Sequence, residues 1–427
     1  MKLLHFSELF QNRNVRKLIE NLFSLSALQL VNHFLPLITY PYLARVLGVK
    51  RFGELAVASA VMVYFQTISD YGFSLTAVRN ISRCREDRNE VEKIFSSVMW
   101  CRVLLAAGCL LLLIPLSMLP EFRPMRLVLF LAFLMIPGHV LFPEWFFQGI
   151  EEMRHIAVLN VLAKLFFTGT IFIFIRKESD YYRQPLLLAV GFFIAGILAL
   201  YIIRRKYRIR WRKPDLGAIR MNFREGWPVF VSLISPTLCN NTFFLGIFCG
   251  DFAAGIYAAA NKLIVVANAA LHTFSRTCFP FLARRFNRYP LYAAAVISAG
   301  AAGTILFLLF APGIIHLVYG ERFHEAGGTL RILAAVPLFL ALFNAFGTNY
   351  MILQGHEKAI RNISLFFSLT GFMLALPLIS RFSYTGAAFS SAYVKCGLGA
   401  AAAVYVLFIF LRRNRASAAD AKEKHDL

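Results

Sequence analysis

Apolar stretches long enough to form membrane-spanning helices follow one another along almost the whole chain, separated by short polar connections. Hydrophobic residues make up 58% of the 427 residues and charged residues only 16%, with a mean hydropathy of +0.61. A soluble chain has roughly 45–50% apolar and about 25% charged residues. Because lipid cannot satisfy backbone polar groups, only helices or closed barrels span a bilayer, and stretches of this length indicate helices.

We therefore predict an all-α polytopic membrane protein with twelve transmembrane helices in two pseudo-equivalent six-helix lobes around a central cavity. Residues 1–20 are expected to form a short amphipathic helix on the cytosolic surface, since charges interrupt their apolar positions. Prolines should interrupt three spans: Pro36 and Pro41 the first, Pro137 and Pro143 the fourth, and Pro236 the seventh. The predicted spans are 21–44, 53–77, 93–119, 127–148, 156–175, 185–203, 227–248, 252–281, 291–315, 329–352, 361–380 and 385–411.

The distribution of lysine and arginine predicts which side each connection faces. With the amino terminus in the cytosol, cytosolic segments hold roughly three times as many cations as the opposite connections, so both termini are placed in the cytosol. The most basic connection, Arg204 to Arg224, is interpreted as a solvated linker resting on anionic headgroups. Trp145, Phe146 and Phe147 end a span near the cytosolic face and suit an interfacial belt or sugar stacking.

Two landmarks that recur at nearly one spacing indicate an internal duplication. Gln148-Gly149-Ile150-Glu151 ends one apolar segment and Gln354-Gly355-His356-Glu357 ends another, 206 positions later. Gly48 and Gly53 precede a run of small and apolar residues, and Gly250 and Gly255 precede another, 202 positions later. Six helices per half is an even number, so the repeats should be parallel. The predicted parts are an amino-terminal lobe (1–203), a basic cytosolic linker (204–226), a carboxyl-terminal lobe (227–411) and a disordered cytosolic tail (412–427).

Cations inside the predicted spans require a polar environment. Arg102, Lys164, Lys262 and Lys395 each lie near the middle of a span, and four such cations facing lipid would cost on the order of 10–14 kcal/mol. That cost is as large as the folding stability of a typical protein. We therefore predict that these four line a water-filled cavity, with Asp70 and Glu144 as acidic counterparts.

One face of the eighth predicted helix concentrates polar residues. Lys262 and Arg276 are fourteen residues apart, nearly four turns, so they project from one face about 21 Å apart. For any single amide, hydrogen bonding between helices is the commoner role. Amides beside cations, however, suit a ligand that is anionic and rich in hydroxyls. The further candidate substrate-binding residues are Asn268 on this helix and Gln29 and Asn32 on the first.

Asp70 and His272 correspond at the 202-residue spacing, and each is a candidate coupling site for a proton or sodium ion. The structural alternative is a packing histidine and an Asp70 salt bridge, with Arg79 or a lysine as its partner. The sequence leaves both open. Arg79 is accordingly grouped with the coupling or gating residues.

Other classes of function are disfavoured. The net charge of +22 does not indicate nucleic acid as a partner, because the cations lie in short runs between apolar segments. The seven cysteines have no CxxC or zinc spacing, so we expect no disulfide and no metal or other cofactor. No stretch is long and polar enough for a soluble catalytic module, which disfavours an enzyme.

The chain resembles bacterial oligosaccharide flippases of the Wzx type, which belong to one superfamily with the lipid II flippases and the multidrug and toxic compound extrusion exporters. The resemblance covers most of the chain and is less distinctive near Tyr393-Val394-Lys395. Its motifs are the segments 35–48, Phe52-Gly53, 70–79, 145–153, 255–263 and Leu330-Arg331-Ile332-Leu333.

The resemblance implies two six-helix lobes around a cationic cavity and transport from the cytosolic to the periplasmic leaflet of the bacterial inner membrane. The implied substrate is an undecaprenyl-pyrophosphate-linked oligosaccharide repeat unit for O-antigen, capsule, exopolysaccharide or enterobacterial common antigen. A polysaccharide polymerase and a chain-length regulator are candidate partners. Two alternatives stay open: a small-solute or drug exporter of the same fold, and an integral-membrane polysaccharide polymerase or ligase.

Overall fold

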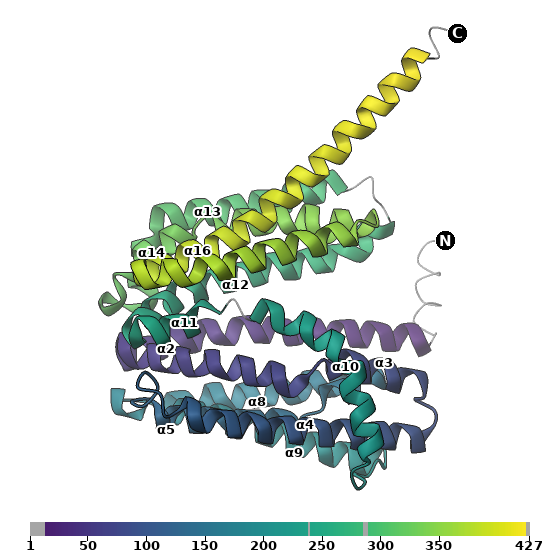
Figure 1. The fold of residues 1–427 in the computed structure, drawn as a ribbon, viewed down its shortest axis with the longest axis vertical. Coiled ribbons are helices and arrows are strands. Elements are labelled where there is room, and N and C mark those ends of the chain that lie inside the picture. The colour runs from purple at the N-terminus through teal and green to yellow at the C-terminus, as the bar shows by residue number, and fades with distance from the viewer. Residues whose placement is uncertain (1–12, 238–239, 285–288, 424–427) are drawn as a thin grey trace. The chain divides into compact units, whose positions relative to one another are not determined.

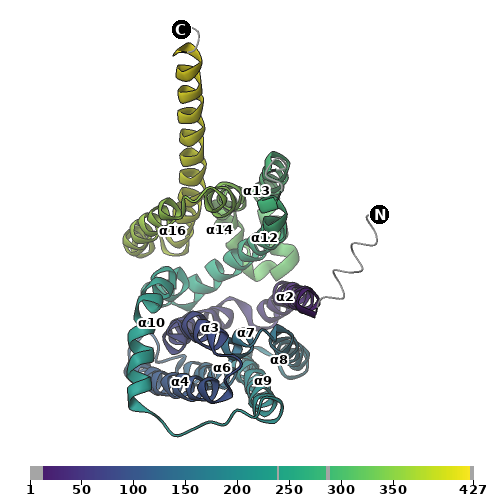
Figure 2. The same cartoon turned by 90° about the vertical axis from the view of Figure 1, so that its right-hand side faces the viewer.

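A computed structural model describes residues 13–237, 240–284 and 289–423 of the chain. Within these residues the secondary structure is helical throughout, without strands, which confirms the predicted all-α class. The chain separates into two compact units, residues 1–247 and 248–427. Each unit is described here by itself (Figures 1 and 2).

The first unit is a bundle whose long helices run side by side, and Figure 2 views several of them end-on. The start of α10 runs at a steep angle to α4 and α9, and α10 then turns to run along the bundle (Figure 1). The helices are α2 (Arg13–Asp70), α3 (Phe73–Arg83), α4 (Arg88–Leu116), α5 (Arg126–Phe133), α6 (Met135–Val140), α7 (Glu144–Gly149), α8 (Met153–Phe174), η1 (Glu178–Asp180), α9 (Arg183–Lys206), α10 (Leu216–Thr237) and α11 (Asn241–Phe248).

The breaks in this unit fall only partly at the predicted prolines. The expected interruption at Pro36 and Pro41 is wrong, because α2 runs through both and departs from helical geometry at Gly48 instead. The fourth predicted span is interrupted as expected, and α6 and α7 are short helices within it. These breaks free backbone carbonyls at membrane depth, which must then be bonded by side chains or water.

The described residues of the second unit are also helical. The last helix passes Ser383, a non-helical residue that separates the two final predicted spans. It continues to Glu423, where the sequence predicted a disordered tail. The helices are α12 (Gly250–Arg284), α13 (Tyr289–Tyr319), η3 (Glu321–Phe323), α14 (Ala326–Leu333), α15 (Val336–Leu342), the π-helix η4 (Phe343–Met351) and α16 (Glu357–Glu423).

Eight helical stretches of the described residues are long and apolar enough to cross a membrane. The last of them, Lys358–Leu411, has 54 residues, enough for two crossings of roughly 20 residues each. The long helix α2 covers the first two predicted spans, with Gly48 between them. The predicted total of twelve spans agrees with these breaks and stays a prediction.

Both pairs of duplicated landmarks have matching backbone features, although the helix ends correspond at 204 residues rather than the 206 that separate the two glutamines. Gly48 and Gly250 both have positive φ, at 71° and 81°, a conformation that glycine adopts without steric cost. The helices ending near Gln148 and Gln354 close alike, with Glu152 N donating to Phe147 O at 2.8 Å and His356 N to Met351 O at 2.7 Å. The preceding residues, Glu151 and Gly355, are left-handed, so the two helix ends correspond at a spacing of 204.

Trp145, Phe146 and Phe147 lie in the hydrophobic core of the first unit. The two phenylalanines are fully buried and Trp145 is 4% exposed; Trp145 packs against Phe95, and Phe146 against Tyr207. Neither the interfacial belt nor the sugar-stacking surface expected from the sequence is therefore correct. The cluster anchors short helix α7 to the bundle, because aromatic rings bury large apolar areas.

Candidate functional site

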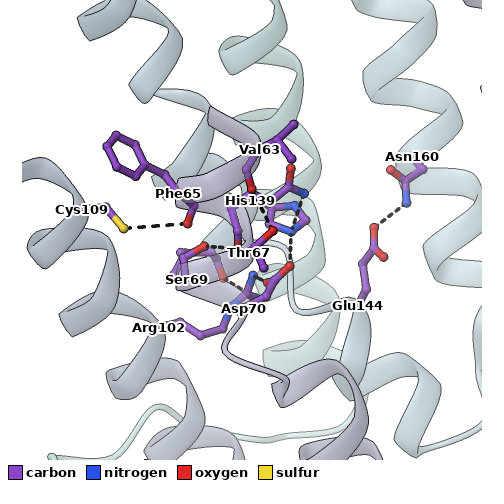
Figure 3. Close-up of polar contacts among 12 residues, drawn as sticks. Val63, Phe65, Thr67, Ser69, Asp70, Arg102, Cys109, His139, Glu144 and Asn160 are labelled. Carbon is purple, nitrogen blue, oxygen red and sulfur yellow. Dashed lines mark hydrogen bonds and ion pairs between the residues drawn. The ribbon is translucent and has the colours of Figure 1, made fainter. Parts of the chain in front are cut away.

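Asp70 and Arg102 form an ion pair in the first unit. Asp70 is the last residue of α2, where Tyr71 and Gly72, both of positive φ, turn the chain into α3. Arg102 lies in the middle of α4, and its Nη2 donates to Asp70 Oδ1 at 2.6 Å (Figure 3). The Arg102 side chain is 2% exposed and that of Asp70 is 31% exposed. The carboxylate therefore compensates a buried cation and keeps one side open.

His139 and Gln66 extend this pair into a cluster, which we call the Asp70 cluster (Gln66, Asp70, Arg102 and His139). His139 Nε2 lies 3.4 Å from Asp70 Oδ2 and 3.2 Å from Gln66 Nε2. Figure 3 shows His139 and Asp70 facing each other across the helices that carry them. Arg102 Nη1 also donates to Val140 O at 3.4 Å, at the end of α6, where the broken helix leaves carbonyls without helical partners.

A second polar group in the first unit contains Glu144, Asn160 and Lys164. Asn160 Nδ2 donates to Glu144 Oε1 at 2.8 Å, joining α8 to the first residue of α7 (Figure 3). Lys164 is one turn beyond Asn160 on α8, half-buried, and interacts electrostatically with Glu144. The predicted acidic counterparts thus accompany the two central cations of this unit, Asp70 with Arg102 and Glu144 with Lys164.

In the second unit, one central lysine bonds the residue next to the other. Lys395 Nζ on α16 donates to Asn261 Oδ1 on α12 at 3.4 Å, and Asn261 is the residue immediately before Lys262. Both lysines are half-buried. Two turns along α12, the Oδ1 atom of Asn268 is buried without a hydrogen-bond partner among the described residues. This face of α12 therefore combines ammonium groups with amides.

Ser275, further along α12, belongs to a separate polar cluster. It is buried and bonded to the Tyr292 hydroxyl at 2.6 Å, and Asn349 Nδ2 donates to both groups. Asn349 lies in the π-helix η4, a rare form that often marks functional positions. Tyr289 adds a bond from its hydroxyl to Ala345 O at 2.5 Å. These bonds tie α12, α13 and η4 together.

The remaining predicted residues are dispersed or lie outside the description. Arg79 pairs with Glu225 at 3.0 Å on an exposed surface, so the structure assigns Asp70 a different partner from the Arg79 considered in the sequence. His272 is exposed. The side chains of Gln29, Asn32 and Arg276 lie outside the described residues.

Sequence reasoning missed His139 and Gln66. His139 sits in a short helix between Pro137 and Pro143, and a polar residue flanked by prolines inside an apolar span was the available signal. Gln66 is one helical turn before Asp70 on α2, on the same face. Both were hidden because their pairing with Asp70 depends on how α6 packs, which spacing along the chain does not encode.

Sequence relatives of this chain handle surface polysaccharides. One, from Escherichia coli K12, is named as a candidate O-antigen transporter; it is 26% identical over 95% of this chain and 99% of its own length. Another from that organism, named lipopolysaccharide biosynthesis protein WzxC, is 25% identical over 81% of this chain and 71% of its own length.

Solved structures with the same fold include an inward-facing transporter of the multidrug resistance MATE family and the lipid II flippase MurJ. Their TM-scores are 0.65 and 0.67 at 17% and 12% identity, over 92% and 93% of this chain and 99% and 87% of theirs. The family described as "Polysaccharide biosynthesis protein" matches residues 18–286. The chain belongs to this polysaccharide biosynthesis family.

Proposed function

We propose that the chain is a flippase that moves undecaprenyl-pyrophosphate-linked oligosaccharide repeat units from the cytosolic to the periplasmic leaflet by alternating access. It is a transporter of the bacterial inner membrane rather than an enzyme, and it serves O-antigen or a related surface polysaccharide. The observation that carries the proposal is a full-length relative named for O-antigen transport together with charged clusters inside apolar helices.

The charge arrangement favours an anionic lipid-linked glycan over the cationic drugs that exporters of the same fold carry. Lys395 bonds Asn261, the residue next to Lys262, and ammonium groups near an amide suit a pyrophosphate with hydroxylated sugars. A polymerase or ligase is disfavoured, because two relatives that match over 99% and 89% of their own lengths are named as O-antigen transporters.

We assign the charged residues of each unit separately. Arg102 is engaged with Asp70 and nearly fully buried, so it orients the Asp70 cluster and reaches substrate only if that ion pair opens. Lys164 has Glu144 and Asn160 as neighbours. Lys262 and Lys395 are then the principal pyrophosphate ligands, with Asn268 and its unpartnered buried oxygen as a ligand for sugar hydroxyls. For Gln29, Asn32 and Arg276 we keep the substrate-binding role predicted from the sequence.

A coupling ion, proton or sodium, acts at the Asp70 cluster in this proposal. Asp70 is the only one of the two sequence candidates, Asp70 and His272, that joins a described cluster of carboxylate, imidazole and amide groups. The partial exposure of the Asp70 side chain gives an ion access to the carboxylate. The second process that makes transport directional is consumption of the product by a polysaccharide polymerase on the periplasmic side.

The decisive experiment is charge reversal in the second unit. In cells that lack their own repeat-unit flippase, Lys262→Glu and Lys395→Glu should abolish surface polysaccharide while the protein stays in the membrane. Lys262→Arg should retain part of the output, because the positive charge remains. Normal polysaccharide with Lys262→Glu would remove this residue from the pathway.

A matched control is Arg322→Glu, which reverses an exposed cation of the same unit that lies between two candidate spans. It should leave polysaccharide output within about twofold of the wild type, because an exposed charge is solvated and contributes little. Equal loss for Arg322→Glu and Lys262→Glu would mean that charge reversal merely damages the unit.

A further inference from the structure

The basic connection between α9 and α10 is fixed to the first unit rather than free in solution. Ser96 Oγ on α4 donates to Arg210 O at 3.3 Å and accepts from Arg212 N at 2.9 Å. Trp100 Nε1 donates to Arg212 O at 2.9 Å, and Arg212 Nε donates to Glu92 at 2.7 Å. These bonds hold the backbone of the connection against α4, so its side chains have a defined direction.

The same attachment continues into the first turns of α10. Asn222 Nδ2 donates to Ser97 Oγ at 2.9 Å, and buried Ile219 packs in the core of the unit. Figures 1 and 2 show this part of α10 running across the direction of the bundle helices, near the end where α9 finishes and α4 begins. A helix held across the end of a bundle of spanning helices lies along the membrane surface.

The outward side of this segment is strongly cationic. Within the described part of the chain, seven of its cations form no ion pair, unlike Arg212 with Glu92 and Lys206 with Glu152. All seven are exposed. They are Arg204, Arg205, Arg208, Arg210, Lys213, Arg220 and Arg224.

Apolar side chains stand among these cations. Trp211 is 40% exposed, Leu216 80%, Met221 58% and Trp227 56%. Tryptophan is enriched where its ring meets lipid headgroups, and basic segments with aromatic and aliphatic side chains lie in the interface of anionic membranes. Solvent alone would disfavour this exposed apolar surface.

We propose that residues 204–224, which we call the basic surface, are a docking surface for phosphate headgroups of anionic phospholipids in the cytosolic leaflet. The cations bind the phosphates while Trp211, Leu216 and Met221 enter the headgroup layer. Because the segment is bonded to α4, this binding also attaches the bundle to the membrane surface. The proposal uses the predicted topology but no step of transport. Its test is therefore independent of the proposed flippase activity.

The test is native mass spectrometry of the full-length purified protein with phosphatidylglycerol or phosphatidylcholine added at matched concentrations. The variant carries glutamine at Arg204, Arg205, Arg210, Lys213, Arg220 and Arg224, leaving Arg208, whose carbonyl bonds Arg88, and Arg212 intact. Bound phosphatidylglycerol should fall at least about tenfold, because each surface cation adds to headgroup attraction. Phosphatidylcholine binding should be weak in both proteins and unchanged.

Two controls keep the outcome specific. Glutamine at the exposed cations Arg123, Arg176 and Lys177, which lie in other connections, should change phosphatidylglycerol binding less than twofold. Replacing the five arginines of the variant by lysine should retain most binding, since charge is kept, and shows that folding tolerates change there. Equal phosphatidylglycerol retention by wild type and glutamine variant, or equal binding of both lipids, would overturn the proposal and leave an acidic protein as the occupant.

Discussion

The buried guanidinium of Arg102 donates to the partly exposed carboxylate of Asp70 at 2.6 Å. The two residues are 32 positions apart in sequence and lie on different helices. A buried cation is tolerated only when it is paired and bonded. The end of α2, the middle of α4 and the broken helix α6 are therefore held together by one charge and its partners. The proposed coupling site therefore also holds these three helices together.

Removing one partner of the Asp70–Arg102 ion pair should destabilise the first unit. Asp70→Asn leaves Arg102 buried without a counter-charge, which typically costs roughly 3–5 kcal/mol, with the lower end expected because Asp70 is 31% exposed. The double variant Asp70→Asn with Arg102→Gln should lose less than the sum of the single changes. Denaturant unfolding in detergent measures this. Glu225→Gln, which breaks the exposed Arg79 pair, is the control, at about 1 kcal/mol or less.

The coupling role of Asp70 predicts a loss of response to ion gradients. In proteoliposomes, a proton or sodium gradient should accelerate transport by the wild type but not by Asp70→Asn, while substrate affinity stays within about threefold. His272→Gln, at the corresponding position of the second unit, should keep the gradient response. If gradients accelerate wild type and Asp70→Asn equally, Asp70 has only its structural role with Arg102.

A comparison of the repeat glycine Gly250 with the helical Gly108 predicts a difference that depends on backbone conformation alone. A Cβ at Gly250 or at Gly108 would meet no atom within 4 Å, but Gly250 has a φ of 81° whereas Gly108 is helical. Gly250→Ala should therefore destabilise by about 1 kcal/mol, and Gly108→Ala should stabilise by roughly 0.4–1 kcal/mol. Thermal unfolding in one detergent compares them. Equal shifts for both would refute the conformational argument.

The predicted orientation can be read from the two ends of α9. Lys177 and Lys213 are both exposed and lie beyond opposite ends of this helix. In a cysteine-free version, Lys177→Cys should react with an impermeant reagent in intact cells and Lys213→Cys only after permeabilisation. The opposite pattern would invert the topology and place the basic surface in the periplasm.

The sequence by itself determined the environment and the class of fold. Long apolar stretches leave helices as the structure that satisfies the backbone, and this constraint is local. The breaks near Pro137 and Pro143 were also readable, since proline removes a helical donor. Gly48 and Gly250 were recognised as repeat landmarks, and their shared positive φ gives the physical reason for glycine at both. The central cations indicated polar surroundings, because a lone charge in lipid has a high free energy.

Only the tertiary structure decided which groups those cations meet. Arg102 was expected beside substrate and is found on Asp70, with His139 completing a cluster that sequence spacing did not reveal. Trp145 and its neighbours proved to be core, and the basic connection proved to be bonded to α4. Such outcomes depend on contacts between helices far apart in sequence, where many packings satisfy the same apolar pattern. Periodicity fixes which face of a helix is polar, and packing alone selects its partner.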